Sequence, residues 1–86
     1  TRYNILVLNG TNTNGLAGNF RSDLQEIGYA NVTIDNAEST DKSIIMCKDS
    51  KLRDILKSDT GIGKTSKDIS NYPEYDAVII LGEDYN

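Results

Sequence analysis

Two short apolar runs constrain the fold of this sequence most. Residues 4–8 read NILVL and residues 77–81 read AVIIL. Both runs are rich in aliphatic residues, and a glycine follows each closely, Gly10 after the first and Gly82 after the second. A strand with one solvent-exposed face alternates polar and apolar residues. Continuous apolar runs therefore predict strands that are covered on both faces of the sheet. We therefore expect two central strands, each followed by a glycine-containing bend.

Two further strands are expected between these runs. Residues 31–35 alternate, with Val32 and Ile34 facing inward, which is typical of a strand near the edge of a sheet. The fourth candidate is the apolar stretch 43–47, SIIMC, which lies between two polar segments.

A helix is predicted between the first two strands. Apolar side chains recur there at helical spacing on one face, at Leu16, Ala17, Phe20, Leu24 and Ile27. Asn14 is the expected N-cap and Gly28 the expected residue after the C-terminal end. Tyr29 follows as a hydrophobic anchor of that end.

A second, shorter helix is predicted from the apolar stripe Leu52, Ile55 and Leu56. Asp49 or Ser50 can cap its start, and it is expected to stop near Ser58. Residues 58–76 then form a long polar connection. Its apolar residues can pin it to the core or make a short edge strand; they are Ile62, Ile69, Tyr72 and Tyr75.

The resulting order, βαββαβ, predicts a single α/β (α+β) domain over residues 1–86. We expect a two-layer sandwich in which two helices cover a four-stranded sheet. Two arrangements fit this order: a ferredoxin-like fold, or a mixed sheet whose first and last strands lie parallel in the middle.

Composition excludes several classes of function. The chain has no His, which removes the usual general base and imidazole ligation of metals. The net charge of −4 disfavours a nucleic-acid module, and no apolar run approaches the roughly 18 residues of a membrane span. The single cysteine, Cys47, is surrounded by apolar residues and is expected in the core. We expect no enzyme, cofactor or metal site.

The loop from Asn9 to Gly15 joins a strand end to a helix start, where backbone N–H groups and the helix dipole favour an anion. The dinucleotide pattern G-x-G-x-x-G is incomplete, because Thr13 stands where the first glycine belongs. The alternative interpretation, which we favour, is that the Asn and Gly residues supply turn conformations and cap the helix.

Two other motifs carry less weight. Residues 61–65, GIGKT, resemble the end of a phosphate-binding loop, but Ser58 replaces the first glycine and no apolar strand precedes them. The acidic residues Asp35, Glu38 and Asp41 lack the spacing of a calcium loop and are expected on the solvated surface.

Several motifs together resemble the LytR_C domain, the C-terminal domain of LytR-CpsA-Psr cell-envelope proteins. The motifs span residues 4–85 and are Ile5-Leu6-Val7-Leu8-Asn9-Gly10-Thr11, Gly15-Leu16-Ala17, Leu24-Gln25-Glu26-Ile27-Gly28-Tyr29, Asp35-Asn36-Ala37 and Asp76-Ala77-Val78-Ile79-Ile80-Leu81-Gly82-Glu83-Asp84-Tyr85. The chain departs from the family at Glu83, where a basic residue is common, and at Ile45-Met46-Cys47, where an aromatic pair is common.

The resemblance implies a non-catalytic, extracytoplasmic module of a bacterial envelope protein. Its expected partner is a cell-wall polymer or another envelope protein. The sequence starts at Thr1 rather than Met, so we expect a processed protein or an excised domain whose targeting segment lies upstream. The resemblance implies that a membrane anchor, and often a glycopolymer transferase domain, precedes the module.

The candidate ligand-binding residues lie in the loops after the two central strands. They are Asn9, Gly10, Thr11, Asn12, Asn14 and Gly15 in the first loop, and Glu83, Asp84 and Tyr85 in the second. If the two strands are parallel neighbours, both loops emerge at one edge of the sheet. The alternative function is a protein-interaction or dimerisation module that uses an exposed sheet edge, at residues 31–35 or 58–76.

Overall fold

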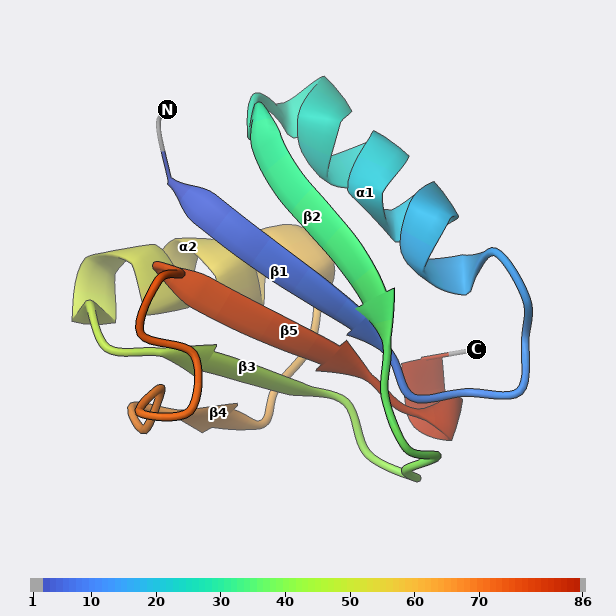
Figure 1. Cartoon of the computed structure of the whole chain (residues 1–86). Helices are drawn as coiled ribbons and strands as arrows, with labels where there is room; N and C mark the ends of the chain where they lie inside the picture. The colour runs from blue at the N-terminus through green and yellow to red at the C-terminus, as the bar shows by residue number, and fades with distance from the viewer. Residues whose placement is uncertain (1–2, 86) are drawn as a thin grey trace.

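Five strands form one mixed sheet in the computed structural model, which describes residues 3–85 (Figure 1). The strands are β1 (Asn4–Asn9), β2 (Asn31–Asn36), β3 (Ile44–Cys47), β4 (Thr65–Ser66) and β5 (Ala77–Leu81). Their order across the sheet is β2-β1-β5-β3-β4. β1 is parallel to both β2 and β5, β3 is antiparallel to β5, and β4 is parallel to β3.

Of the two arrangements expected from the sequence, the mixed sheet is the one observed, and the ferredoxin-like order is wrong. The expected number of four strands is also wrong. The fifth strand, β4, is a two-residue edge strand within the 58–76 connection. A short edge strand was one of the two possibilities expected there from the sequence.

Two βαβ units build the sheet, one containing α1 (Leu16–Ile27) and the other α2 (Ser50–Thr60). β1 and β3, the first strands of the two units, run in opposite directions. The second strands, β2 and β4, lie at opposite edges of the sheet. Because βαβ crossovers are right-handed, both helices then lie on the same face. One core cluster contains side chains of both helices, which confirms the two-layer arrangement.

Strand alternation divides the apolar side chains between two faces. The helix-covered face holds the main core, with Ile5, Val7, Ala17, Phe20, Leu24, Tyr29, Val32, Ile45, Cys47, Leu52, Leu56, Ile62, Ala77, Ile79 and Leu81. On the other face Leu6, Leu8 and Val78 are buried, and Tyr72 and Tyr75 from the connection before β5 pack against them. β1 and β5 are therefore covered on both faces, as the sequence predicts.

The start of α1 differs from the prediction. Gly15, not Asn14, occupies the N-cap position, with a left-handed φ of 82°, and no side chain of residues 3–85 caps the helix. Asn14 lies one residue too early and is exposed. The other end agrees with the prediction, because the N–H of Gly28 donates to Leu24 O and Gln25 O.

α2 is capped as expected, since Asp49 Oδ1 accepts a hydrogen bond from Lys51 N (2.9 Å). The helix ends at Thr60, two residues beyond the expected Ser58, and Gly61 follows in the left-handed region. Ile27 of α1 and Ile55 of α2 are 52% and 49% exposed, so the apolar face assigned to each helix from the sequence is wider than the face that is buried. Each helix meets a single layer, so only the narrow stripe that faces the sheet is buried.

Candidate functional site

The loops after β1 and β5 lie at the same edge of the sheet (Figure 1). The two strands are parallel, and Asn9 is the register partner of Leu81. We call this end of the sheet the carboxyl edge. The predicted proximity of the two loops is confirmed, and the segment 37–43 between β2 and β3 joins them there.

Backbone hydrogen bonds join the loop after β1, the loop after β5 and residues 37–43 into one network, which we call the web. The donors and acceptors are Gly10 N to Leu81 O (2.9 Å), Thr40 N to Gly10 O (2.9 Å), Glu83 N to Thr40 O (2.9 Å) and Asp84 N to Asp41 O (3.0 Å). A carboxylate adds a further link, because Glu83 Oε2 accepts from Asn12 N (3.0 Å). Glu83, where the family commonly has a basic residue, thus connects the two loops.

Asn9 organises the first loop from within. Its Oδ1 accepts from Thr11 N (3.0 Å) and Thr11 Oγ1 (2.6 Å), and its Nδ2 donates to Thr13 O (2.9 Å). The side chain is only 8% exposed. Asn9 and Thr11 therefore use their polar groups to hold the turn, which is one part of the interpretation favoured from the sequence. The other part, helix capping by these residues, is not observed among residues 3–85.

Ser43 and Asp84 fasten the second loop. Asp84 Oδ1 accepts from Ser43 Oγ (2.7 Å) and Ser43 N (2.8 Å), while the buried Ser43 Oγ accepts from Gly82 N (2.9 Å). The hydrogen bond from the Ser43 side chain, followed by that from its backbone, lowers the pKa of Asp84 below its usual value. The sequence placed Ser43 only as the start of a strand, because no local pattern connects it to a residue 41 positions away.

The glycines after the two central strands allow close backbone approach. A Cβ on Gly10 would lie 2.8 Å from Leu81 O, and a Cβ on Gly82 would lie 2.5 Å from the carbonyl carbon of Lys42. No side chain fits at either position without a shift of the neighbouring backbone.

Tyr85 packs against the helix layer through α1. It ends the 3₁₀ helix η1 (Glu83–Tyr85), and its ring meets Phe20 of α1 edge to face, with the centroids 5.1 Å apart. Burial, followed by the charge of Asp23, raises the pKa of the Tyr85 hydroxyl.

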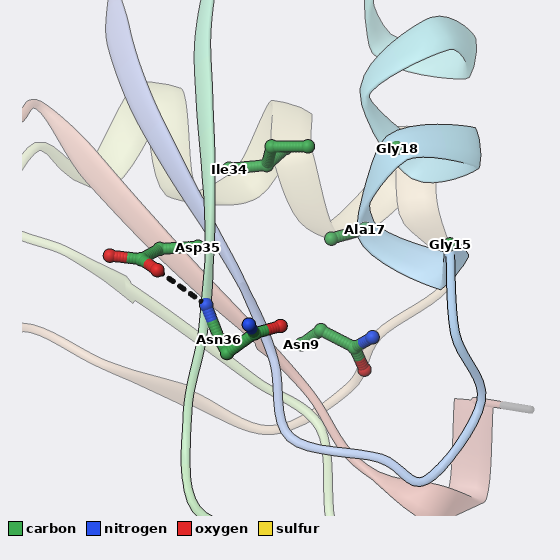
Figure 2. Close-up of a pocket in the computed structure, with 7 residues that line it drawn as sticks. All are labelled: Asn9, Gly15, Ala17, Gly18, Ile34, Asp35 and Asn36. Carbon is green, nitrogen blue, oxygen red and sulfur yellow. Dashed lines mark hydrogen bonds between the residues drawn. The ribbon is translucent and has the colours of Figure 1, made fainter.

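A cleft of about 250 Å³ opens between the start of α1 and the end of β2 (Figure 2). We call it the α1 cleft; its lining residues are Asn9, Gly15, Ala17, Gly18, Ile34, Asp35 and Asn36. Ala37 N donates to Asn9 O (3.0 Å), which fixes the end of β2 beside β1. Figure 2 shows that the Ile34 side chain points toward the helix and that the Asp35 carboxylate points away from it, toward Asn36 N (2.8 Å).

Two of the nine predicted site residues, Asn9 and Gly15, line the α1 cleft. Asn12 and Asn14 are exposed, and Asn14 directly precedes the cleft residue Gly15 in the chain. The other five make structural contacts. Gly10, Thr11, Glu83 and Asp84 form hydrogen bonds within and between the loops, and the ring of Tyr85 packs on Phe20. Sequence reasoning missed Ala17, Gly18, Ile34, Asp35 and Asn36 as cleft residues. The available signals were the motifs Gly15-Leu16-Ala17 and Asp35-Asn36-Ala37.

The chemistry available to this edge is hydrogen bonding. The first-turn N–H groups of α1 have no acceptor within the helix and no capping side chain. Residues 3–85 contain no group of three or more His, Cys, Asp or Glu side chains that could hold a metal ion. Cys47 is fully buried in the core, as predicted, and burial raises the pKa of its thiol. Neither helix of the described chain is long and apolar enough to cross a bilayer.

Comparison with known proteins identifies a family. The LytR_C model, described as "LytR cell envelope-related transcriptional attenuator", matches residues 2–85. No curated protein and no solved structure matches the chain. The family match extends over nearly all of the 86 residues, so it includes the loops at both ends of the strands.

Proposed function

Because the chain belongs to the LytR_C family of cell-envelope domains, we propose that it is a non-catalytic, extracytoplasmic module that docks a cell-wall polymer or a wall-associated partner. In this proposal the docking surface is the α1 cleft with the exposed loop residues Asn12 and Asn14. A membrane anchor, and often a glycopolymer transferase domain, lies elsewhere in the parent protein.

The uncapped start of α1, which opens onto the cleft, is the observation that carries the proposal. Backbone N–H groups there offer hydrogen bonds to ligand oxygens, and the helix dipole favours partial negative charge. The amide of Asn36 adds both a donor and an acceptor. The nearby Asp35 and the net charge of −4 disfavour a dense polyanion, so we expect neutral or weakly anionic polymer segments.

Gly18 provides a direct test. A Cβ at this position would lie 4.0 Å from Ile34 Cδ1, which is an ordinary contact, and Gly18 lines the cleft, so we expect a larger side chain here to fill part of it. The assay is co-sedimentation of the chain with purified bacterial cell walls that retain their attached polymers. We expect Gly18→Leu to weaken wall binding by about tenfold while the circular dichroism spectrum stays unchanged.

Gly63→Leu is the matched control, because Gly63 has open space around it and an ordinary φ. It should bind walls as the unaltered chain does. Equal binding by Gly18→Leu and Gly63→Leu would contradict the proposal, as would a wild-type chain that does not sediment with walls.

A second candidate function is supported by β2. Among residues 3–85 this edge strand pairs only with β1, so its outer backbone groups can pair with a strand of another chain. Self-association through β2 predicts a dimer whose fraction rises with concentration in light scattering. A monomer at all concentrations would exclude this alternative and leave polymer docking intact.

A further inference from the structure

The opposite end of the sheet, which we call the amino edge, contains a pocket of about 500 Å³, twice the volume of the α1 cleft. Aromatic, apolar, acidic and basic side chains line this amino-edge pocket, among them Tyr3, Lys48, Asp49, Ile69, Tyr75 and Asp76. Its volume falls within the range of small-molecule sites, roughly 300 to 1,000 Å³.

The amino-edge pocket is lined by residues next to the ends of three strands, by Leu52 of α2 and by residues of the connection before β5. β1 and β5 both start here and β3 ends here, because Ala77 is the register partner of both Ile5 and Cys47. Asp76 is fixed by a reciprocal pair of bonds, from Asn4 N to Asp76 Oδ2 (2.7 Å) and from Asp76 N to Asn4 O (2.8 Å). Asp49 is fixed by its role as the N-cap of α2.

Each of these two carboxylates keeps one oxygen without a hydrogen-bond partner among residues 3–85. Asp76 uses Oδ2 and Asp49 uses Oδ1, so Asp76 Oδ1 and Asp49 Oδ2 remain. An ionised carboxylate only accepts hydrogen bonds, so the group it binds must be a donor. Hydrogen bonds to a charged acceptor are also the stronger ones.

The aromatic lining adds a second requirement. Tyr3 and Tyr75 are partly exposed, and Pro73 lies beside them in the lining. Their rings offer flat apolar surfaces, while each tyrosine hydroxyl can donate and accept. A ligand that suits the pocket therefore has an apolar face and several hydroxyl donors around its rim.

We propose that the amino-edge pocket binds a pyranose unit of a glycan. The C–H face of the sugar packs on Tyr3 or Tyr75, and its hydroxyls donate to Asp49 and Asp76. A peptide fits less well, because β1, β5 and β3 each have a neighbouring strand on both sides and offer no edge for strand addition. This site goes beyond the proposed function, since it lies at the other end of the sheet from the α1 cleft.

The test is an NMR titration of the isotope-labelled chain, residues 1–86, with chitotetraose and with maltotetraose. We expect at least one of these sugars to shift the backbone amides of Lys48, Asp49, Ile69 and Asp76. Tyr75→Ala should weaken that binding by about tenfold. Asp76→Asn, which keeps the shape and can still accept from Asn4 N, should weaken it by about fivefold.

Tyr72→Ala is the matched control for Tyr75→Ala. Both tyrosines pack against the second core from the same connection, but Tyr72 does not line the pocket. Equal binding by the two tyrosine variants overturns the inference, as does the absence of shifts with both sugars. A proline-rich peptide that shifts the pocket amides more strongly than the sugars also overturns it. Wall binding that depends on Gly18 but not on Tyr75 leaves the proposed function standing and removes the second site.

Discussion

The two ends of the sheet differ in the burial of the polar side chains that fix them: Asn9 and Ser43 are buried at the carboxyl edge, whereas Asp49 and Asp76 are exposed at the amino edge. At the carboxyl edge, Asn9, Ser43 and Asp84 direct their polar atoms into the web. At the amino edge, Asp49 and Asp76 each retain one unpaired carboxylate oxygen beside a larger pocket. Within residues 3–85 no buried side-chain nitrogen or oxygen lacks a partner, so the unpaired atoms are accessible ones. Polar residues that stand out in a sequence motif can therefore have a structural role, while less prominent polar residues can be the ones that are free to bind a ligand.

The comparison has a consequence for stability. Substitutions in the web should destabilise the fold, whereas equivalent substitutions away from it should not. The three predictions below test this difference, and the first two have a matched control taken from elsewhere in the chain.

The largest effect is expected at Gly82. In Gly82→Ala the new Cβ meets the backbone of Lys42 at 2.5 to 2.8 Å, which forces the web apart. We expect a loss of about 3 kcal/mol or more in the free energy of unfolding, measured by urea denaturation. Gly63→Ala, in open space, should change it by less than about 0.5 kcal/mol. Equal unfolding midpoints for the two variants would show that the web tolerates expansion.

A smaller effect is expected at Ser43. Ser43→Ala removes the acceptor of Gly82 N and a donor to Asp84, and leaves a buried N–H unpaired. The expected loss is about 1 to 3 kcal/mol by the same measurement. Ser70 also donates to an aspartate, Asp68, at 2.7 Å, but is exposed. Ser70→Ala should therefore lie within about 0.5 kcal/mol of the wild type, and a Ser43→Ala variant equally close to it would mean that the web carries little stability.

The smallest effect is the acid dependence of stability. Hydrogen bonds from Ser43 lower the pKa of Asp84 in the folded chain. The folded state then binds this proton less readily than the unfolded state, so the contribution is present above about pH 4 and is lost as the pH falls through the folded pKa. Asp84→Asn should flatten the decline of the unfolding midpoint between neutral and acidic pH. An unchanged pH profile would show that the Ser43 to Asp84 bonds do not favour the charged form.

The parts of the fold with local patterns could be predicted from the sequence. The apolar runs of β1 and β5 and the spacing of Phe20 and Leu24 each depend on neighbouring residues alone. The exposure of Ile27 and Ile55 could not be predicted, because it depends on how much of each helix the sheet covers. The two-residue β4 is too short to leave a pattern.

The candidate site divides in the same way. The proximity of the two loops follows from the parallel pairing of β1 and β5, which the apolar runs favoured. The α1 cleft also needs the end of β2, and its position beside Gly18 depends on the register between β2 and β1. The role of Ser43 depends on a contact across the whole fold, so no pattern near residue 43 indicates it.

The central claim is that the carboxyl edge is a fixed frame around a docking cleft. The most direct measurement is an NMR titration of the labelled chain with soluble fragments of digested bacterial cell wall. The account predicts shifts at Gly15, Gly18 and Asn36, with little change at the web amides of Thr40 and Asp84. Wall fragments that bind without shifting the cleft amides, or that shift the web amides instead, would contradict it.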